Sequence, residues 1–246
     1  MITVIRSFVY DVVQTIITVA VLLFMILLLP FPWYVTLNVV KVWARVLRFL
    51  SRWMVGIDVR VIGEENIPEG PVVVAVKHQS AWETAIFPLL LPNTVYVLKK
   101  ELLSIPIWGW CARKVRSISV DRAGGGSALK KMLGETKDRL SEGRRVVIFP
   151  EGTRVLPGQS NTYHPGIAAI YRSANVPVVP VALNSGLSWG RRSIGTKYPG
   201  TITVQFLPAI EPGLDRKVFM DTLKSQIDAA TEKLEAEATA TMSRTH

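Results

Sequence analysis

A long apolar run near the beginning of the chain most constrains how this sequence can fold. The residues from Val12 to Leu29 are apolar apart from one Gln and two Thr. The run reaches the lower limit for a helix that crosses a bilayer with a hydrocarbon core about 30 Å thick. A signal peptide usually has a shorter apolar core and a small-residue cleavage site, whereas Pro30–Tyr34 follows here. We therefore expect a membrane anchor.

The next segment, residues 36–54, predicts a second helix with a basic stripe. Lys and Arg recur every three or four positions between residues 41 and 52, so they share one helical face. Such a helix suits the membrane interface, and basic residues after an anchor favour the cytoplasmic face of the inner membrane for the rest of the chain. The pattern leaves open whether this two-helix hairpin crosses the bilayer or dips into one leaflet. The residues expected at the interface are Trp43, Arg45, Arg48, Arg52 and Trp53.

The overall charge and the single cysteine narrow the class of protein. The net charge is +10, which suggests polyanionic partners, but no helix-turn-helix or zinc-finger spacing is present. Much of the basic excess lies beside the apolar segments, so anionic lipid and phosphorylated substrates explain it better than nucleic acid does. Cys111 stands alone, which excludes an internal disulfide framework and fits a reducing compartment.

From residue 58 onward, short β-branched runs alternate with helical patterns. This alternation predicts an α/β fold with a mostly parallel sheet flanked by helices, whose ligands bind beyond the carboxyl ends of the strands. The expected domains are a membrane-anchoring segment, 1–55, and a second domain, 56–246. Strands are expected at 58–62, 71–76, 94–98, 116–120, 145–149, 178–183 and 201–206, and helices at 82–90, 127–141, 167–174 and 216–234.

A histidine and a carboxylate follow the apolar strand predicted at 71–76. His78 lies just past that strand, and a histidine can take a proton from a hydroxyl near neutral pH. Glu83 could fix the tautomer of His78 if the chain turns between them, and Ser80 as the N-cap of a helix would supply that turn. The same residues also fit an ordinary helix start, so this segment alone leaves both readings open.

A second polar cluster follows the strand predicted at 145–149. Pro150 and Gly152 favour a tight turn, while Glu151, Thr153 and Arg154 offer an acceptor, a hydroxyl and a guanidinium. Arginine is well suited to a bidentate grip on phosphate. Two such clusters after two of the most apolar strands favour a functional site at that edge of the sheet.

These segments together resemble the glycerolipid acyltransferase family. His78-x-x-x-x-Glu83 is similar to the family motif H-x-x-x-x-D, with Glu in place of Asp, so the backbone must absorb one extra methylene. The segment from Phe149 to Arg154 matches the F-P-E-G-T-R motif letter for letter. Within residues 60–210, in the family's order, the other similar segments are Lys99–Leu102, Ile105–Gly109, Val120–Arg122 and Val176–Leu183.

The resemblance implies a specific reaction. His78 would act as general base on the sn-2 hydroxyl of a lysophosphatidic acid, which attacks an acyl thioester directly, and Glu83 would orient His78. The thioester would be carried by acyl-carrier protein or coenzyme A, with no metal or other cofactor. Another lysolipid, such as a lyso-ornithine lipid, or glycerol 3-phosphate are alternative acceptors. The residues implied at the acceptor phosphate are Lys99, Arg122, Glu151, Gly152, Thr153 and Arg154.

Alternatives from other classes rest on weaker patterns. Gly186–Gly190 fits G-x-S-x-G, which would make Ser188 the nucleophile of an esterase, but the next residues predict no helix and the only later histidine is His246. A non-enzymatic membrane adaptor would leave the two polar clusters unexplained. The glycines at 124–126 lack P-loop spacing and predict a loop before a helix capped by Ser127. His164 is expected to be a loop histidine.

Overall fold

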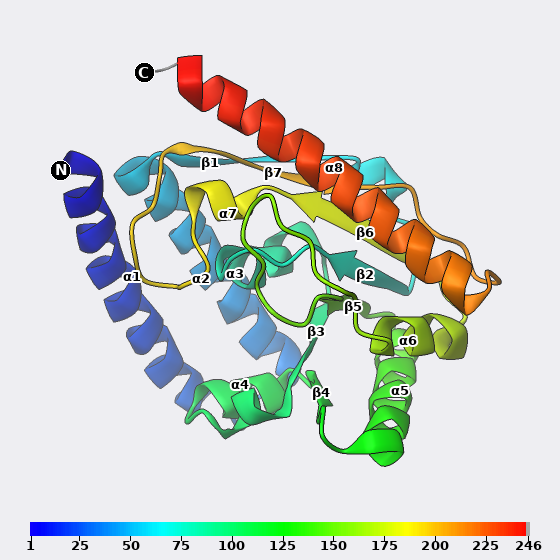
Figure 1. The fold of residues 1–246 in the computed structure, drawn as a ribbon. Helices are drawn as coiled ribbons and strands as arrows, with labels where there is room; N and C mark the ends of the chain where they lie inside the picture. The colour runs from blue at the N-terminus through cyan, green and yellow to red at the C-terminus, as the bar shows by residue number, and fades with distance from the viewer. Residues whose placement is uncertain (245–246) are drawn as a thin grey trace.

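A computed structural model describes the backbone of residues 1–244 and the side chains of residues 1–241. The chain begins with two long helices, α1 (Ile2–Leu27) and α2 (Trp33–Val55), joined by a short turn (Figure 1). The predicted helical hairpin is therefore present, although each helix begins earlier than its sequence pattern suggests. Within the described residues, α1 is the one helix that is long and apolar enough to cross a membrane.

Seven strands within the described residues form one sheet, in the order β1-β7-β6-β2-β5-β3-β4. The five strands from β6 to β4 are parallel, and β7 joins β6 antiparallel, with β1 parallel to β7. The predicted, mostly parallel α/β sheet is thus confirmed. The strands are β1 (Ile57–Ile62), β2 (Val72–Val76), β3 (Thr94–Lys99), β4 (Ile118–Val120), β5 (Arg145–Ile148), β6 (Val178–Leu183) and β7 (Gly200–Phe206).

The remaining helices differ from expectation at three places. Helix α5 begins at Gly125, so Ser127 lies inside it and is not its N-cap. Helix α8 continues through residue 244, past the predicted end at 234. Helices α4 and α7 and the 3-10 turns were not predicted. The elements are η1 (Glu64–Asn66), α3 (Trp82–Leu90), η2 (Lys100–Ser104), α4 (Trp108–Lys114), α5 (Gly125–Ser141), α6 (Gly166–Ala174), α7 (Ser185–Ser188) and α8 (Arg216–Arg244).

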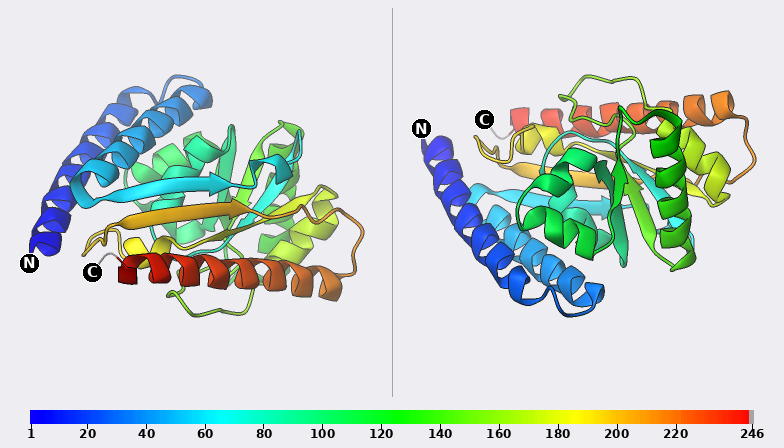
Figure 2. Two further views of the ribbon diagram at one scale, coloured as in Figure 1. Left: turned by 90° about the horizontal axis from the view of Figure 1, so that it is seen from above. Right: turned by 90° about the horizontal axis from the view of Figure 1, so that it is seen from below.

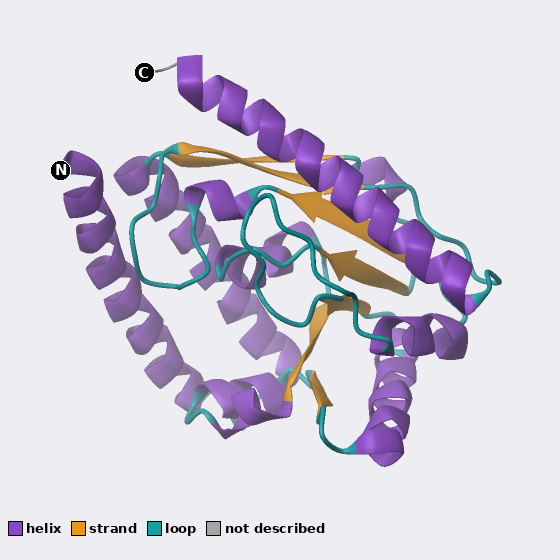
Figure 3. Ribbon diagram, in the orientation of Figure 1, coloured by secondary structure: helices purple, strands orange, loops and turns teal. Residues whose placement is uncertain are grey.

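Helices cover both faces of the sheet (Figures 2 and 3). Strand β2 lies near the centre, and its side chains alternate between the two faces. Val72, Val74 and Val76 pack in a core with residues of α2 and α3. Val73 and Ala75 pack in a second core with residues of α5, α6 and α8. A strand covered on both faces has to be apolar throughout, which explains the run Val72–Val76.

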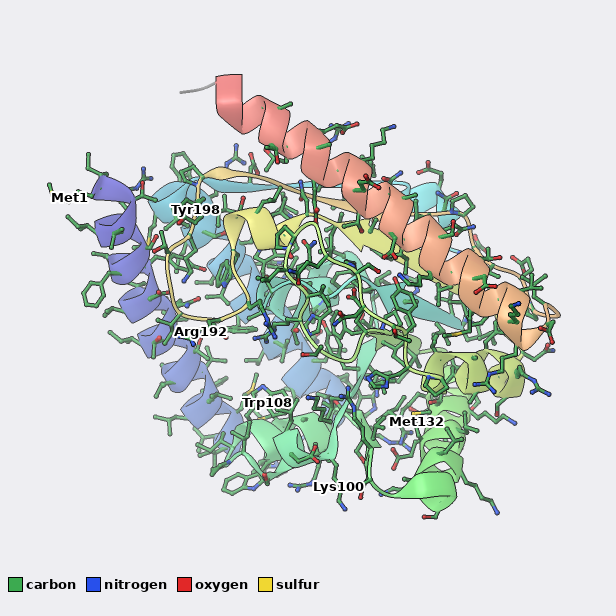
Figure 4. All side chains as sticks on the ribbon, viewed as in Figure 1. Met1, Lys100, Trp108, Met132, Arg192 and Tyr198 are labelled. Carbon is green, nitrogen blue, oxygen red and sulfur yellow. The ribbon has the colours of Figure 1, made fainter. Side chains whose placement is uncertain are left out.

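A polar stripe on α1 holds this helix to the rest of the molecule. Ser7, Asp11 and Gln14 are buried on α1, where they meet the α7–β7 loop, which we define as residues 189–199. Asp11 forms an ion pair with Lys197 and accepts the Gly195 N–H at 2.9 Å. The Gln14 amide donates to the Ser193 carbonyl at 3.2 Å. Figure 4 shows Arg192 and Tyr198 on this loop, near α1.

The expected interfacial residues of α2 divide into two groups. Arg45, Arg48, Arg52 and Trp53 are exposed, and Trp53 is 69% accessible. Trp43 instead turns inward, where its indole N–H donates to the Thr18 hydroxyl of α1 at 3.1 Å. Trp43 is half-buried and contacts α1, and its place at the membrane interface stays a prediction.

Candidate active site

The side chains of His78 and Glu83 are in contact at the end of β2. The chain turns between these two residues, as the sequence predicts for such a pair. His78 Nδ1 lies 3.0 Å from Glu83 Oε1, and Glu83 is in the first turn of α3. The turn is held by the backbone N–H groups of Gln79 and Ser80, which donate to the same carboxylate oxygen at 2.6 and 2.8 Å. The Ser80 hydroxyl also accepts the Trp82 N–H at 2.9 Å. The chain therefore turns here as predicted, but α3 begins at Trp82 with Ala81 as its N-cap, so the prediction of Ser80 as the N-cap is wrong.

The second oxygen of Glu83 is held by two hydroxyl groups. Ser80 Oγ donates to Glu83 Oε2 at 3.0 Å, and Ser185 Oγ, from the start of α7, donates at 2.9 Å. Burial opposes the charged carboxylate, but hydrogen bonds from His78 and from the backbone outweigh it and lower the pKa of Glu83. Glu83 is therefore an anion that accepts Nδ1–H of His78, which leaves Nε2 as the basic nitrogen.

A second buried carboxylate fixes the backbone on the other side of His78. Glu151 Oε2 accepts the His78 N–H at 3.0 Å, and its Oε1 accepts Lys77 Nζ at 2.6 Å. Lys77 also donates to the Gln159 carbonyl at 3.2 Å and lies 3.6 Å from Asp228 of α8. Burial raises the pKa of Glu151, and Lys77 opposes this rise. Glu151 thus contacts the chain that carries His78.

One cavity of about 990 Å³ connects His78 with the two N-terminal helices. Its apolar part includes Leu22 and Met25 of α1 and Leu37, Val40 and Leu47 of α2. Its polar part includes His78 together with Lys99, Arg122, Gly152, Arg154 and His164. Four of the six residues expected at a phosphate therefore line the cavity. Glu151 and Thr153 do not, because the Glu151 side chain faces Lys77 and Thr153 points to the exterior.

Gly152 shapes the polar part of the cavity. Its backbone has φ 62°, a conformation that favours glycine, and its carbonyl accepts Arg122 Nη2 at 2.7 Å. A Cβ at this position would lie 2.3 Å from Arg122 Nη2. The absence of a side chain at Gly152 therefore lets Arg122 reach the turn.

Arg154 is oriented by the α7–β7 loop. Its Nη1 donates to the Arg191 carbonyl at 2.6 Å. Burial lowers the pKa of Arg154, whereas the nearby charge of Glu83 raises it. Because this loop also holds α1, it connects the first helix with a cationic residue of the cavity.

Three residues near His78 were not anticipated from the sequence. Lys77 precedes His78, and nothing in its local sequence indicates its pairing with Glu151. Ser185 follows β6, a neighbour of β2, so the rule that ligands gather beyond parallel strand ends could have found it. His164 lies in the segment between β5 and α6 and lines the cavity, whereas its sequence suggested only a loop.

The esterase alternative does not match the local geometry. Ser188 is buried and is the last residue of α7, after which Trp189 is extended. A nucleophile elbow needs the serine at a turn from a strand into a helix. Ser188 does not line the cavity, and His246 is outside the described residues. Among the described residues, no three His, Cys, Asp or Glu side chains gather in a way that could hold a metal ion.

The comparisons with known proteins agree with this arrangement. The 1-acyl-sn-glycerol-3-phosphate acyltransferase of Pseudomonas aeruginosa is 41% identical over 172 residues, which cover 70% of this chain and 66% of that protein. The lyso-ornithine lipid O-acyltransferase of the same species is 31% identical over 142 residues, or 55% of this chain and 53% of that protein. The chain thus spans about two thirds or less of these relatives.

The fold is also shared with a solved structure. The crystal structure of the 1-acyl-sn-glycerophosphate (LPA) acyltransferase from Thermotoga maritima has a TM-score of 0.78 at 20% identity, and covers 94% of this chain and 97% of that one. The family model described as Acyltransferase matches residues 58–184, which include β2, His78, Glu83 and the 149–154 turn. This chain belongs to the acyltransferase family.

Proposed function

We propose that this protein transfers an acyl chain from a thioester to the sn-2 hydroxyl of 1-acylglycerol 3-phosphate, giving phosphatidic acid. The observation that carries the proposal is the pairing of His78 with Glu83 at 3.0 Å in a cavity that has a cationic end and an apolar end. A lysolipid phosphate has the same division, with an anionic headgroup at one end and a hydrocarbon chain at the other.

The proposed reaction needs only one proton relay. His78 Nε2 takes the proton from the sn-2 hydroxyl while its oxygen attacks the thioester carbonyl. Glu83 stabilises the imidazolium that forms, as the buried aspartate does in a serine hydrolase triad. The C–S bond then breaks, and the proton passes from His78 to the leaving thiolate. The new C–O bond completes the ester without an acyl-enzyme.

The cationic residues of the cavity are proposed to bind the acceptor phosphate. Lys99, Arg122 and Arg154 supply the positive charge, and Gly152 allows the phosphate to approach the turn. Glu151 has an indirect role, because its carboxylate is occupied by Lys77 and by the backbone of His78. Thr153 is exposed outside the cavity and contributes at most through the turn it belongs to.

The N-terminal helices are proposed to place the cavity at the cytoplasmic face of the inner membrane. Side chains on the outer surface of α1, such as Phe8 and Leu23, are exposed and apolar, and the exposed face of α2 carries Arg45 and Arg48. Such a surface suits contact with acyl chains and anionic headgroups. An acceptor could then enter the cavity from the lipid phase.

The first experiment follows acyl transfer by the purified protein in vesicles that contain 1-acylglycerol 3-phosphate. Acyl-coenzyme A and acyl-carrier protein are tested as separate labelled donors, which identifies the donor. His78→Ala should lower kcat by about 10²–10⁴-fold, the usual contribution of a general base. Arg154→Ala should raise the KM for the acceptor more than it lowers kcat. Ser188→Ala is the matched control and should keep its activity.

Three results would contradict the proposal. Thioester hydrolysis without transfer, stopped by Ser188→Ala but not by His78→Ala, would indicate an esterase. Full transfer by His78→Ala would remove His78 from the chemistry. Absence of both transfer and hydrolysis by a protein that binds vesicles would indicate a membrane adaptor.

A lyso-ornithine lipid is the second acceptor to test, because one relative with 31% identity is named for it. An ornithine headgroup has no phosphate and carries an amine, so the cationic part of this cavity favours the phosphate-bearing acceptor. If the protein turns over the lyso-ornithine lipid preferentially, that lipid replaces 1-acylglycerol 3-phosphate as the proposed acceptor, and the proposed role of His78 is unchanged.

A further inference from the structure

His164 and Arg122 converge on the turn at Gly152. A Cβ placed on Gly152 would lie 2.3 Å from Arg122 Nη2 and 2.8 Å from His164 Nε2. The two nitrogens are therefore close to the same point, although Arg122 precedes α5 and His164 precedes α6. Both residues line the cavity that contains His78.

Backbone hydrogen bonds fix the position of His164 relative to this turn. The His164 N–H donates to the Pro150 carbonyl at 2.8 Å, and the Gly152 N–H donates to the Phe149 carbonyl at 2.9 Å. The Gly152 carbonyl is held by Arg122. His164 lies ten residues after Arg154, and its backbone hydrogen bond to Pro150 fixes the imidazole beside the turn that carries Arg154.

The charges that face His164 come from neighbouring elements and are positive. Burial lowers the pKa of His164, and Arg122 and then Lys99 lower it further. Two carboxylates of the adjoining segments pair with lysines: Asp121 with Lys100, and Glu151 with Lys77. The empty cavity therefore favours the neutral imidazole, and an anion placed among these groups would favour its protonated form.

We infer that His164, Arg122 and Lys99 form a titratable subsite for a phosphate ester, in which His164 becomes protonated when the phosphate binds. This inference rests on the proposed function and names a further binding residue for it. The phosphate can come from the acceptor lipid or from the phosphorylated carrier of the donor, which share this chemistry. His164 would then act in binding, whereas His78 acts on the hydroxyl.

Proton uptake gives the subsite a defined pH dependence. At low pH His164 is already charged, and its contribution to phosphate binding is greatest. As the pH rises past the pKa of His164 in the empty cavity, binding must take up a proton and weakens progressively. Above its pKa in the complex, His164 contributes no charge. The phosphate also titrates in this range, but that effect is common to all variants and cancels in the ratio of their KM values.

The test compares His164→Gln and His164→Lys with the parent chain, from about pH 5.5 to about pH 9. His164→Gln should raise the KM for the phosphate-bearing substrate about tenfold at the acid end, as expected for the loss of a charged hydrogen bond. This ratio should approach one at the alkaline end, and kcat should change little. His164→Lys should restore a low KM that no longer depends on His164 protonation. Lys131→Gln, on the exposed side of α5, is the control and should behave as the parent.

The two sources of phosphate are separated by which KM changes. A change in the acceptor KM assigns the subsite to 1-acylglycerol 3-phosphate, and a change confined to the donor KM assigns it to the carrier. An unchanged KM for both substrates in His164→Gln would overturn the inference. So would a rise in KM that is the same at every pH, because a purely structural role would give that result.

A binding measurement separates failure of this inference from failure of the proposed function. Calorimetric titration with 1-acylglycerol 3-phosphate, in two buffers of different ionisation enthalpy, counts the protons taken up on binding without any turnover. Proton uptake by the parent that is lost in His164→Gln would support the subsite even if no acyl transfer occurred. Equal proton uptake by both would exclude it even if the parent were an active acyltransferase.

Discussion

Helices α1 and α8, the two longest of the described elements, are fixed to the molecule in opposite ways. Helix α1 buries the polar side chains of Ser7, Asp11 and Gln14 and exposes apolar ones. Helix α8 buries apolar side chains, among them Phe219 and Leu223, and directs mostly polar ones outward. The helices lie on different sides of the sheet (Figure 2). The inverted polarity agrees with the proposal that α1 faces lipid, whereas α8 has a polar outer surface.

Both helices also reach the site from their own side. Asp228 of α8 lies 3.6 Å from Lys77, and Glu235 of α8 accepts the side-chain amide of Gln79. Helix α1 acts through the α7–β7 loop, whose Arg191 carbonyl holds Arg154. The histidine and the proposed phosphate ligand are therefore supported by two helices that face different surroundings.

The largest expected effect comes from the buried ion pair of Lys77, which follows β2, with Glu151. Lys77→Met leaves Glu151 buried without its cation and should lower the free energy of unfolding by about 3–5 kcal/mol. It should also lower kcat, because Glu151 positions the backbone of His78. Lys224→Met is the control, since Lys224 pairs with the same Asp228 but is 40% exposed and should cost about 1 kcal/mol or less. Denaturant unfolding in detergent measures both; equal losses would contradict the role of burial.

The second-largest effect is expected from removing a buried apolar side chain of α8, and a much smaller one from removing an exposed apolar side chain of α1. Phe219→Ala on α8 removes a ring that stacks on Tyr171 with centroids 3.8 Å apart, and should cost about 3 kcal/mol of unfolding free energy. Phe8→Ala on α1 removes an exposed ring and should change it by about 0.5 kcal/mol or less. The same unfolding assay checks both variants. A large loss in Phe8→Ala would mean that α1 is packed against protein where the structure exposes it.

A change in the polar stripe of α1 should lower the free energy of unfolding by a smaller amount and should also loosen the α7–β7 loop. Asp11→Asn weakens the ion pair with Lys197 and should cost about 1–3 kcal/mol. The loosened α7–β7 loop should be cut faster by trypsin at Arg191 and Arg192, and the acceptor KM should rise as Arg154 loses its support. Asp58→Asn removes a largely exposed pair with Arg52 and serves as the control. An unchanged rate of proteolysis in Asp11→Asn would show that α1 does not stabilise the α7–β7 loop.

The smallest effect on folding should accompany the clearest effect on membrane binding. Trp53→Ser, at an exposed position of α2, should change the unfolding free energy by about 0.5 kcal/mol or less. It should lower partitioning into anionic vesicles, because an aromatic side chain leaves the interface. Val218→Ser, at an exposed position of α8, should leave partitioning unchanged. Co-sedimentation with vesicles measures both, and equal losses would contradict the contrast between the two surfaces.

The sheet and the His78–Glu83 pair could be predicted because both depend on residues that are close together in the sequence. An apolar strand covered on both faces reads as a continuous run, and a capping turn brings residues five apart into contact. With its extra methylene, the Glu83 carboxylate still lies 3.0 Å from His78 Nδ1 and accepts hydrogen bonds from Ser80 and Ser185. The bounds of α3 and β6 agree with the predicted ranges for the same reason.

Long-range partners were not predictable, since nothing local marks them. Glu151 was expected at a phosphate because its neighbours belong there, but Lys77, far away in sequence, turns its side chain into the protein. The hydrogen bond of Trp43 to Thr18 joins two helices, so the basic stripe of α2 could not predict it. His164 was read as a loop residue because its proximity to Arg122 depends on how two separate loops meet.

The polar stripe on α1 also restricts how this helix can change over time. Outward residues such as Phe8 and Leu23, which do not line the cavity, can be exchanged one at a time to suit the proposed lipid surroundings. One inserted residue would instead rotate the preceding part of the helix by about 100° and turn Asp11 away from Lys197. The α7–β7 loop would then lose its hold on α1, and Arg154 its orienting carbonyl. Helix α1 therefore tolerates substitutions on its outer face but not the insertion of a residue.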